Sequence, residues 1–201
     1  MDIDIVIENL RKRRINAESF SDRAKLVNYI LTETQNDKTI GFGGSLTLEE
    51  LGLYDILKET GKEVFWHWKV EPEERLDILH KAQNTDSYFS STNAITLDGR
   101  LVNIDGNGNR VSSMIFGPKK VFIIIGKNKI AKDLDDAINR VKTVVCPNNA
   151  RRLVRKVPCA ITNECSDCKG IERMCNVTTI IEGNIPTIDM RVCLVDECLG
   201  Y

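Results

Sequence analysis

The chain has 201 residues, with 28 Lys and Arg against 29 Asp and Glu, which gives a formal net charge of −1. This balance argues against a dedicated nucleic-acid-binding protein, which usually presents a strongly basic face. The aromatic content is only 6%, and basic and aromatic residues do not alternate along the sequence. With 42% hydrophobic residues, the composition predicts a globular chain that buries one sizeable core.

The termini and the cysteines predict a cytoplasmic protein with no membrane insertion. The first residues, MDIDIVIENL, are acidic and lack the order of a secretory signal, and the longest apolar run, VFIII at 121–125, is far too short for a membrane span. Seven cysteines without an export signal indicate free thiols or metal ligands rather than a disulfide framework.

The first predicted elements are two helices, a strand and a third helix. Helical spacing places Ile3, Val6, Ile7 and Leu10 on one face of the first, and the basic run at 11–14 follows on its last turn. The second helix is predicted to bury Phe20, Ala24, Val27 and Leu31. A strand at 39–42 then leads through a glycine-rich turn into a helix that carries Leu48 and Leu51.

The middle of the chain continues this alternation. A strand at 63–66 precedes a helix that is opened by Pro72 and is expected to bury Leu76 and Leu79. A short strand near 86–90 follows, and then a hairpin whose strands, NAITL and RLVNID, are joined by the Asp98-Gly99 turn.

The run KKVFIIIG predicts a strand buried on both faces, which is typical of parallel sheets, and a helix from Ile130 to Val141 follows it. The pattern therefore predicts an α/β fold with a mostly parallel sheet flanked by helices. We expect a core over residues 1–155. The segment 156–201 would contain a cysteine cluster and two strands, near 177–182 and 190–195, that return to the core.

The turn GFGGSLT is the first candidate binding site. A glycine-rich turn between a strand and a helix lets backbone N–H groups approach an anion. The ligand-binding candidates are Gly41, Gly43, Gly44, Ser45 and Thr47. A tight turn with Ser45 as the helix N-cap explains the same residues equally well.

The stretch TNAITLDGRLVNIDGNGNRV is the second candidate. Turn chemistry accounts for Asp98 and Gly99, and DGNGN reads as another turn before a helix that begins near Arg110. The remaining polar residues are candidates for a pocket wall: Asn93, Asn103, Asn109 and Arg110 as ligand-binding residues, with Asp98 and Asp105 as candidate general bases. Arg110 is expected to clamp a carboxylate or phosphate with two hydrogen bonds.

Only two histidines are present, and no GxSxG turn offers a serine nucleophile. His67, in WHW, follows a strand end, where ligands bind in α/β sheets, so it is a further ligand-binding candidate. Packing or a surface role is the alternative for both histidines.

The C-terminal part of the chain carries a cysteine cluster in CAITNECSDCKGIERMC. Two cysteines separated by two residues can share one metal centre, and flanking cysteines can complete four ligands. The candidate metal ligands are Cys159, Cys165, Cys168 and Cys175, for zinc or an iron–sulfur cluster, although the spacing matches neither a common zinc ribbon nor a bacterial ferredoxin. Cys146, Cys193 and Cys198 are expected to be small core residues.

In combination, several segments resemble the lactate-utilisation (LUD) domain family over nearly the whole chain: GFGGSLTLEELGL, STNAITLDGRLVNIDGNGNRV, GPKKVFIIIGKNKI, PNNARRL and DECLGY. The resemblance implies a fold in the superfamily of ribose-5-phosphate isomerase, glucosamine-6-phosphate deaminase and CoA transferases. In those relatives, the turn that corresponds to 41–47 binds phosphate or an acyl group. An acidic residue after a mid-domain strand often serves in catalysis, and Asp98 is the nearest match.

Two functions follow as expectations. The first is an enzyme or sensor that binds a small anionic metabolite between the turn at 41–47 and the segment from Asn93 to Arg110. The second is an accessory or assembly subunit of a redox complex, in which the cysteines form a structural or electron-transfer site. The resemblance implies a link to lactate oxidation and to iron–sulfur redox proteins as partners, although this chain lacks a ferredoxin-type double-cluster domain.

Overall fold

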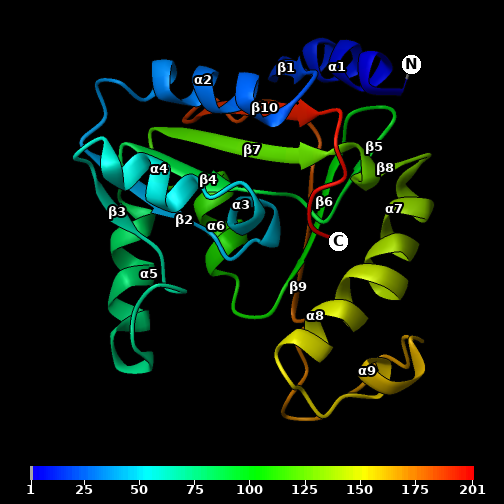
Figure 1. Ribbon diagram of the computed structural model, residues 1–201. Helices are drawn as coiled ribbons and strands as arrows, with labels where there is room; N and C mark the ends of the chain where they lie inside the picture. Colours follow the sequence, from blue (N-terminus) through cyan, green and yellow to red (C-terminus); the bar gives the residue numbers. More distant parts are fainter. Residues whose placement is uncertain (1) are drawn as a thin grey trace.

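A six-stranded parallel sheet forms the centre of the computed structural model, which describes residues 2–201 (Figure 1). In spatial order its strands are β1 (Asn16–Phe20), β10 (Asp189–Val195), β7 (Lys120–Gly126), β4 (Ser87–Ser90), β2 (Thr39–Phe42) and β3 (Glu63–Phe65). All neighbouring strands are parallel, which confirms the predicted fold class.

A second, smaller sheet contains the predicted hairpin. Its order is β8 (Ile130–Ala131), β5 (Ala94–Thr96), β6 (Leu101–Asp105) and β9 (Val177–Ile181). Strand β6 runs antiparallel to both β5 and β9. The hairpin loop spans residues 97–99, because Thr96 N donates to Arg100 O, so it is one residue longer than the predicted Asp-Gly turn. Gly99 has φ 85°, the left-handed conformation that such a loop favours.

Helices cover both faces of the main sheet. They are α1 (Asp2–Lys12), α2 (Arg23–Glu33), α3 (Leu46–Glu50), α4 (Leu53–Glu59), α5 (Arg75–Gln83), α6 (Asn109–Ile115), α7 (Leu134–Arg140), α8 (Cys146–Arg152) and α9 (Pro158–Thr162), with short helical turns η1 (Pro72–Glu74), η2 (Lys127–Lys129) and η3 (Val141–Val145). The second sheet, α1 and α6 share one apolar cluster with the main sheet, whereas α2, α3 and α4 share the other.

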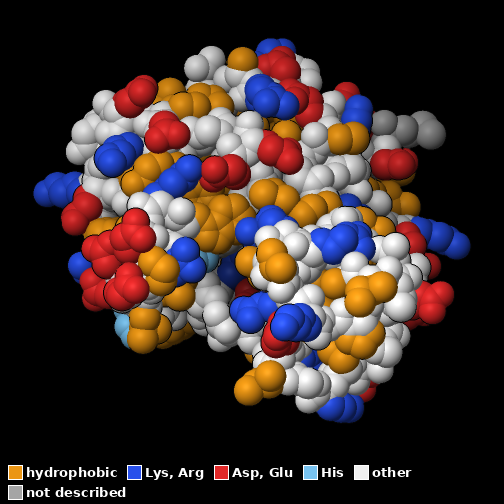
Figure 2. All heavy atoms as spheres, turned by 60° about the horizontal axis from the view of Figure 1, so that its bottom comes forward, with side chains coloured by type: hydrophobic (Ala, Val, Ile, Leu, Met, Phe, Trp, Pro, Cys, Tyr) orange, Lys and Arg blue, Asp and Glu red, His pale blue; other side chains and the backbone are white. Residues whose placement is uncertain are grey.

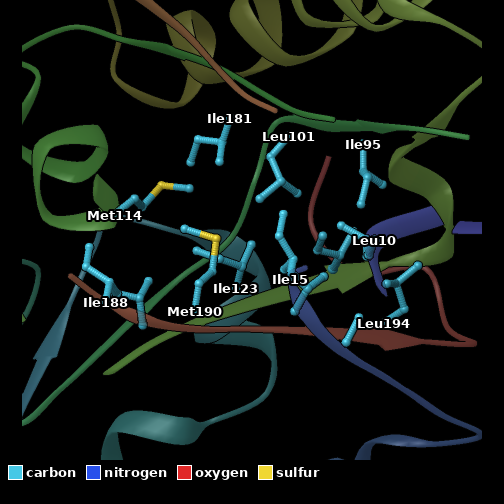
Figure 3. Packing of buried hydrophobic residues seen from close by; sticks show 14 of the residues in the cluster. Leu10, Ile15, Ile95, Leu101, Met114, Ile123, Ile181, Ile188, Met190 and Leu194 are labelled. Atoms are coloured by element: carbon cyan, nitrogen blue, oxygen red, sulfur yellow. The ribbon is translucent and has the colours of Figure 1, made fainter. Parts of the chain in front are cut away.

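Strand β7 shows why the sheet lies between two cores. Val121, Ile123 and Ile125 contribute to the cluster with α1 and the second sheet, part of which is seen in Figure 3. Phe122 and Ile124 contribute to the opposite cluster. Because side chains alternate along a strand, this run must be apolar throughout to be buried on both faces, as the sequence predicted.

A long helical segment runs from α7 through η3 to α8 (Figure 1). Its second half lines a cavity of the molecule. The wider π turn of η3 directly precedes Pro147, which lies in the first turn of α8. Proline has no N–H to donate and would clash with the preceding turn of a regular helix, so a local change of helical pitch accommodates it. The predicted helix therefore continues past the point where the sequence composition changes.

Three local predictions were wrong. Phe20 lies in β1 rather than on the second helix. That helix buries Leu26 and Ile30; of the predicted face, Val27 and Leu31 pack half-buried against the same cluster, whereas Ala24 is exposed. Leu76 is 65% exposed, because α5 covers the sheet with Ala82 and not with its first turn. The first error came from extending a helical period into a strand, and the others from tertiary packing that selects a different helix face.

The last part of the chain joins both sheets. Strand β10 lies in the main sheet between β1 and β7, and β9 lies at the edge of the second sheet beside β6. Between α8 and β9, the segment that contains α9 projects from the lower end of the molecule in Figure 1. Residues 2–201 include no helix with the length and apolar character that crossing a membrane requires.

Candidate functional site

A cavity of about 570 Å³ lies at the carboxyl ends of the main sheet's strands. Its wall includes Ser45 and Thr47 from the loop after β2, Ser91 from the loop after β4 and Lys129 from the turn after β7. These three strands are neighbours and run parallel, so their carboxyl ends meet at one edge of the sheet. Ligands bind at this edge in open α/β sheets.

The cavity concentrates positive charge. Among the described residues, its lining contains a single acidic side chain, that of Asp105. Six cationic side chains also line it: Arg75, Arg110, Lys129, Arg152, Arg155 and Arg173. Figure 2 shows Lys and Arg side chains along one side of the hollow in this face. Because the whole chain has a net charge of −1, this is a local arrangement rather than a consequence of a basic sequence.

Lys129 is the most deeply buried of these cations, with 4% of its surface exposed. Its Nζ donates to Thr47 Oγ1 at 2.7 Å and to Ser91 Oγ at 2.9 Å, and it forms no ion pair with any residue of 2–201. Burial, together with repulsion from Arg140 and Arg110, lowers the pKa of Lys129 to about 7. A buried ammonium group that two neutral hydroxyls hold is unusual unless an anion joins it.

Arg110 lies at the cavity wall but is held by the protein itself. Its guanidinium has five N–H donors in a fixed plane. Their partners are Ser91 O (3.1 Å), Asn103 Oδ1 (2.6 Å), Asn93 Oδ1 (3.4 Å), Ile104 O (3.2 Å) and Asp105 Oδ2 (3.3 Å). Both terminal nitrogens of the guanidinium thus donate to protein acceptors, and Nε faces Asp105, so the two-point ligand clamp that the sequence suggested stays a prediction. Arg110 fixes the loops after β4 and β6 against each other.

Asp105 is the candidate base that the structure places in the cavity wall. Its Oδ1 accepts from the backbone N–H groups of Asn107 (3.1 Å) and Gly108 (2.9 Å), while Oδ2 faces Arg110. This is the turn chemistry that the sequence offered as the alternative explanation. The carboxylate thus shapes the DGNGN turn at the edge of the cavity.

Asp98, the other candidate base, lies outside the cavity wall. It is in the hairpin loop, where its carboxylate contacts Thr96, Arg100 and Arg13. The hydrogen bond from Thr96 and the neighbouring Arg100 and Arg13 outweigh partial burial and lower the pKa of Asp98. Asp98 therefore ties the hairpin to α1, and the catalytic role that the resemblance implied has no support in its position.

The glycine-rich turn contributes in two ways. Gly44, Ser45 and Thr47 line the cavity, and Ser45 also caps α3 by accepting from Leu48 N at 3.4 Å. Gly41 is a packing residue, because an added Cβ would lie 2.2 Å from Ala82 O in α5. An added Cβ at Gly43 would lie 2.8 Å from the Tyr88 hydroxyl and 3.0 Å from Arg110, so this glycine leaves room for the arginine.

The three candidate asparagines also fall into two groups, those that line the cavity and one that supports its wall. Asn93 and Asn109 line the cavity, whereas Asn103 is fully buried behind it. The side chain of Asn103 accepts from Arg110 and from Asn93 N, so it supports the wall from behind. The two glycine-bearing bends of the sequence therefore meet at the same rim of the sheet.

His67 and Trp68 follow β3 and form the side of the cavity next to Gly44. Burial, with Arg75 and Arg152 nearby, lowers the pKa of His67 to about 4, so its imidazole is neutral at physiological pH. Its Nδ1 is buried without a hydrogen-bond partner. The guanidinium of Arg152 lies 4.6 Å from the centre of the Trp68 ring, which holds this cation at the cavity wall.

Five cysteines surround a second hollow of about 150 Å³: Cys146, Cys159, Cys165, Cys168 and Cys175. The four predicted metal ligands thus lie together. The prediction that Cys146 and Cys198 are core residues was wrong, because Cys146 joins this group and Cys198 is exposed, while Cys193 is buried as expected. Within residues 2–201, no three of the His, Cys, Asp or Glu side chains already converge at the geometry of a metal-ion site.

Sequence reasoning missed Lys129, Arg152 and Trp68. Lys129 had a usable signal, because it follows the most strongly predicted strand, and ligand-binding residues gather at strand ends. Arg152 had none, since the long helix that brings it to the cavity was predicted to end near Val141.

Two comparisons identify the family. The family model described as the LUD domain matches residues 3–195. A crystal structure of a DUF162 family protein from Deinococcus radiodurans, a family that is the same as the LUD domain family, is similar in fold, with a TM-score of 0.57 and 10% identity over 96% of each chain. No curated protein matches the chain. The chain therefore belongs to the LUD domain family, which is associated with lactate utilisation.

Proposed function

We propose that the protein binds a small anionic metabolite in the cavity at the strand ends, in the metabolism of lactate or a related 2-hydroxy acid. One observation carries the proposal: six Lys and Arg side chains line this cavity with a single Asp, in a chain of net charge −1. Cations gathered in a recessed site attract anions and bind them more strongly than cations on an open surface do.

The positions of the free cations favour a ligand with two anionic groups. Lys129, the most deeply buried of them, donates to two neutral hydroxyls and has no carboxylate partner within the described part of the chain. Arg75 and Arg155 are exposed at the opening, and Arg152 lies against Trp68. The volume of about 570 Å³ is within the usual range for cofactor-sized ligands, which favours a phosphorylated metabolite or an acyl-CoA over lactate itself.

The same site offers a group for proton transfer. An amine whose pKa is about 7 is present in both protonation states at neutral pH, as a general acid or base requires. In this proposal, Lys129 takes the role that the sequence suggested for Asp98 or Asp105. Asp105 keeps its neighbouring loop in place through two backbone N–H groups and Arg110.

A thermal-shift screen tests the proposal. Purified protein is heated with lactate, with sugar phosphates and with acyl-CoA, and we expect at least one phosphorylated compound to raise the melting temperature by several degrees. The Lys129→Met variant should lose this shift, whereas Lys132→Met, which changes an exposed lysine three residues away, should keep it. No shift with any of the three classes would contradict the proposal.

A second candidate function is that of an accessory subunit in an iron–sulfur redox complex. The observation that favours it is the group of five cysteines around one hollow beside the cavity. Mixing with candidate redox partners under reducing, oxygen-free conditions, followed by size-exclusion chromatography, tests it. Elution of a stable complex would support this function, and separate elution of the components would contradict it.

A further inference from the structure

The hollow lined by the five cysteines is separate from the anion cavity, and its cysteines come from α8, from α9 and from the loop before β9. Cys146 is the first residue of α8, and Cys159 lies in α9. Cys165, Cys168 and Cys175 are in the loop that leads to β9. Three wall residues, Ile104, Cys146 and Arg173, also line the anion cavity, so the two hollows share a wall.

All five cysteines are free thiols, and all five line the hollow. The Sγ atoms of Cys146 and Cys175 are 3.4 Å apart. Cys159, Cys165 and Cys168 line the same hollow, and within residues 2–201 no three His, Cys, Asp or Glu side chains form a ready site for a single metal ion. A zinc ion at about 2.3 Å from each sulfur requires four thiolates in a tight tetrahedron. A larger iron–sulfur core instead needs thiolates spaced around it.

The charges around the hollow suit an anionic cluster. Lys142 and Arg173 line it. The Arg173 guanidinium donates to the carbonyl oxygens of Cys168 and Cys175, so it braces two of the cysteines directly. The one carboxylate in the wall, Asp167, is paired with Lys169 and Arg173. A cluster with four thiolate ligands is negatively charged, and nearby cations offset the cost of holding it away from water.

The segment has little else to hold it. Helix α9 contains no buried residue, and Ile161 is 87% exposed. Exposed backbone with few apolar contacts is weakly held by packing alone. Several ligands bound to one metal centre hold such a loop through coordination, as in small metal-binding domains.

We propose that the hollow binds an iron–sulfur cluster through Cys159, Cys165, Cys168 and Cys175, with Cys146 beside Cys175 on the side facing the anion cavity. Each ligating thiol loses its proton when it binds iron. The inference is independent of the proposed anion site, because it rests on the thiols and their surroundings alone. It makes the wall shared by the two hollows the boundary between a metal centre and a ligand site.

Purification without oxygen, followed by analysis of iron, sulfide and zinc, tests the proposal. We expect brown protein with about four irons and matching sulfide per chain, either as isolated or after reconstitution with ferrous iron and sulfide. Colourless protein with about one zinc per chain would overturn the proposal. So would protein that contains no metal under either condition.

Variants assign the ligands. Cys168→Ser should lose most of the iron and the visible absorption, whereas Cys198→Ser, at an exposed cysteine outside the hollow, should keep both. Cys146→Ser should keep the iron but change the electron paramagnetic resonance spectrum of the reduced cluster. Circular dichroism shows whether each variant is folded. Iron loss by folded Cys198→Ser, full iron retention by Cys168→Ser or an unchanged spectrum for Cys146→Ser would overturn the assignment.

Discussion

The two hollows of the molecule are built by different means. The anion cavity is formed by loops that follow adjacent parallel strands, and buried residues such as Arg110 and Asn103 lock those loops together. The cysteine hollow is formed mostly by the exposed segment around α9, a helix that contains no buried residue. A site that the core holds is ready before its ligand arrives, whereas a site on a weakly packed segment depends on its ligand for order.

Arg110→Gln should have the largest effect on stability, and it tests whether Arg110 locks the loops of the anion cavity together. It removes the donor of several buried acceptors and the cation that faces Asp105, so we expect a loss of about 3 kcal/mol in the free energy of unfolding. Urea denaturation measures it. The matched Arg75→Gln change, at an exposed side chain, should cost less than about 0.5 kcal/mol. Equal costs for the two variants would contradict a locking role for Arg110.

Lys129→Met should make the ligand-free protein more stable, because it removes a buried charge without an ion-pair partner. The folded pKa of about 7 lies below the unfolded value of 10.5. The unfolded chain therefore binds an extra proton between these values. The penalty on folding is full below pH 7 and disappears as the pH rises towards 10.5.

We expect a gain of about 2 kcal/mol at pH 7, reduced from the full penalty because the hydroxyls of Thr47 and Ser91 lose their donor. The gain should shrink at pH 10. Thermal unfolding at both pH values measures it. A variant that is less stable than wild type at pH 7 would show that Lys129 already has a stabilising partner.

Anion affinity should depend on pH through the same lysine. Below pH 7, Lys129 is protonated in the free protein and affinity should be constant. Above pH 7, the ammonium must be regenerated before the anion binds, so affinity should fall by up to about tenfold per pH unit. Isothermal titration between pH 6 and 9 measures this, with Lys129→Met as the flat control. An affinity of wild type that does not change with pH would contradict a contact between Lys129 and the ligand.

The smallest effect is expected in the cysteine segment. In metal-free protein, Cys168→Ser should change the free energy of global unfolding by less than about 0.5 kcal/mol, because this segment packs little against the sheets. Urea denaturation followed by tryptophan fluorescence reports on Trp66 and Trp68, at the other site. A loss above about 2 kcal/mol would show that the two regions fold as one unit.

The sequence predicted the fold class because the strands carry clear patterns. The run VFIII and the strand at 39–42 were located well, and the meeting of the turn at 41–47 with the segment from Asn93 to Arg110 follows from neighbouring strand ends. In the second sheet, the hairpin and the strand near 177–182 were also located, whereas β8, which has only two residues, was assigned to the helix from Ile130 to Val141.

The sequence predicted where the candidate site lies better than it predicted what each residue does there. Arg110, Asn103 and Gly43 belong to the site through packing and hydrogen bonds behind its wall, which no spacing in the sequence reveals. Asp98 had the chemistry of a base but lies in a hairpin loop away from the cavity. Cys146 is separated from the other cysteines in sequence, and only the path of the long helix brings it beside Cys175.

The central claim is that the buried Lys129, in the cavity at the carboxyl ends of the strands, binds a negatively charged metabolite. The most direct measurement is the dissociation constant of the strongest phosphorylated ligand for wild type and for Lys129→Met at pH 6.5. We expect the variant to bind at least about 100-fold more weakly while it remains folded, because a charge-assisted contact in a buried site is lost. Equal dissociation constants for the two proteins would contradict the account.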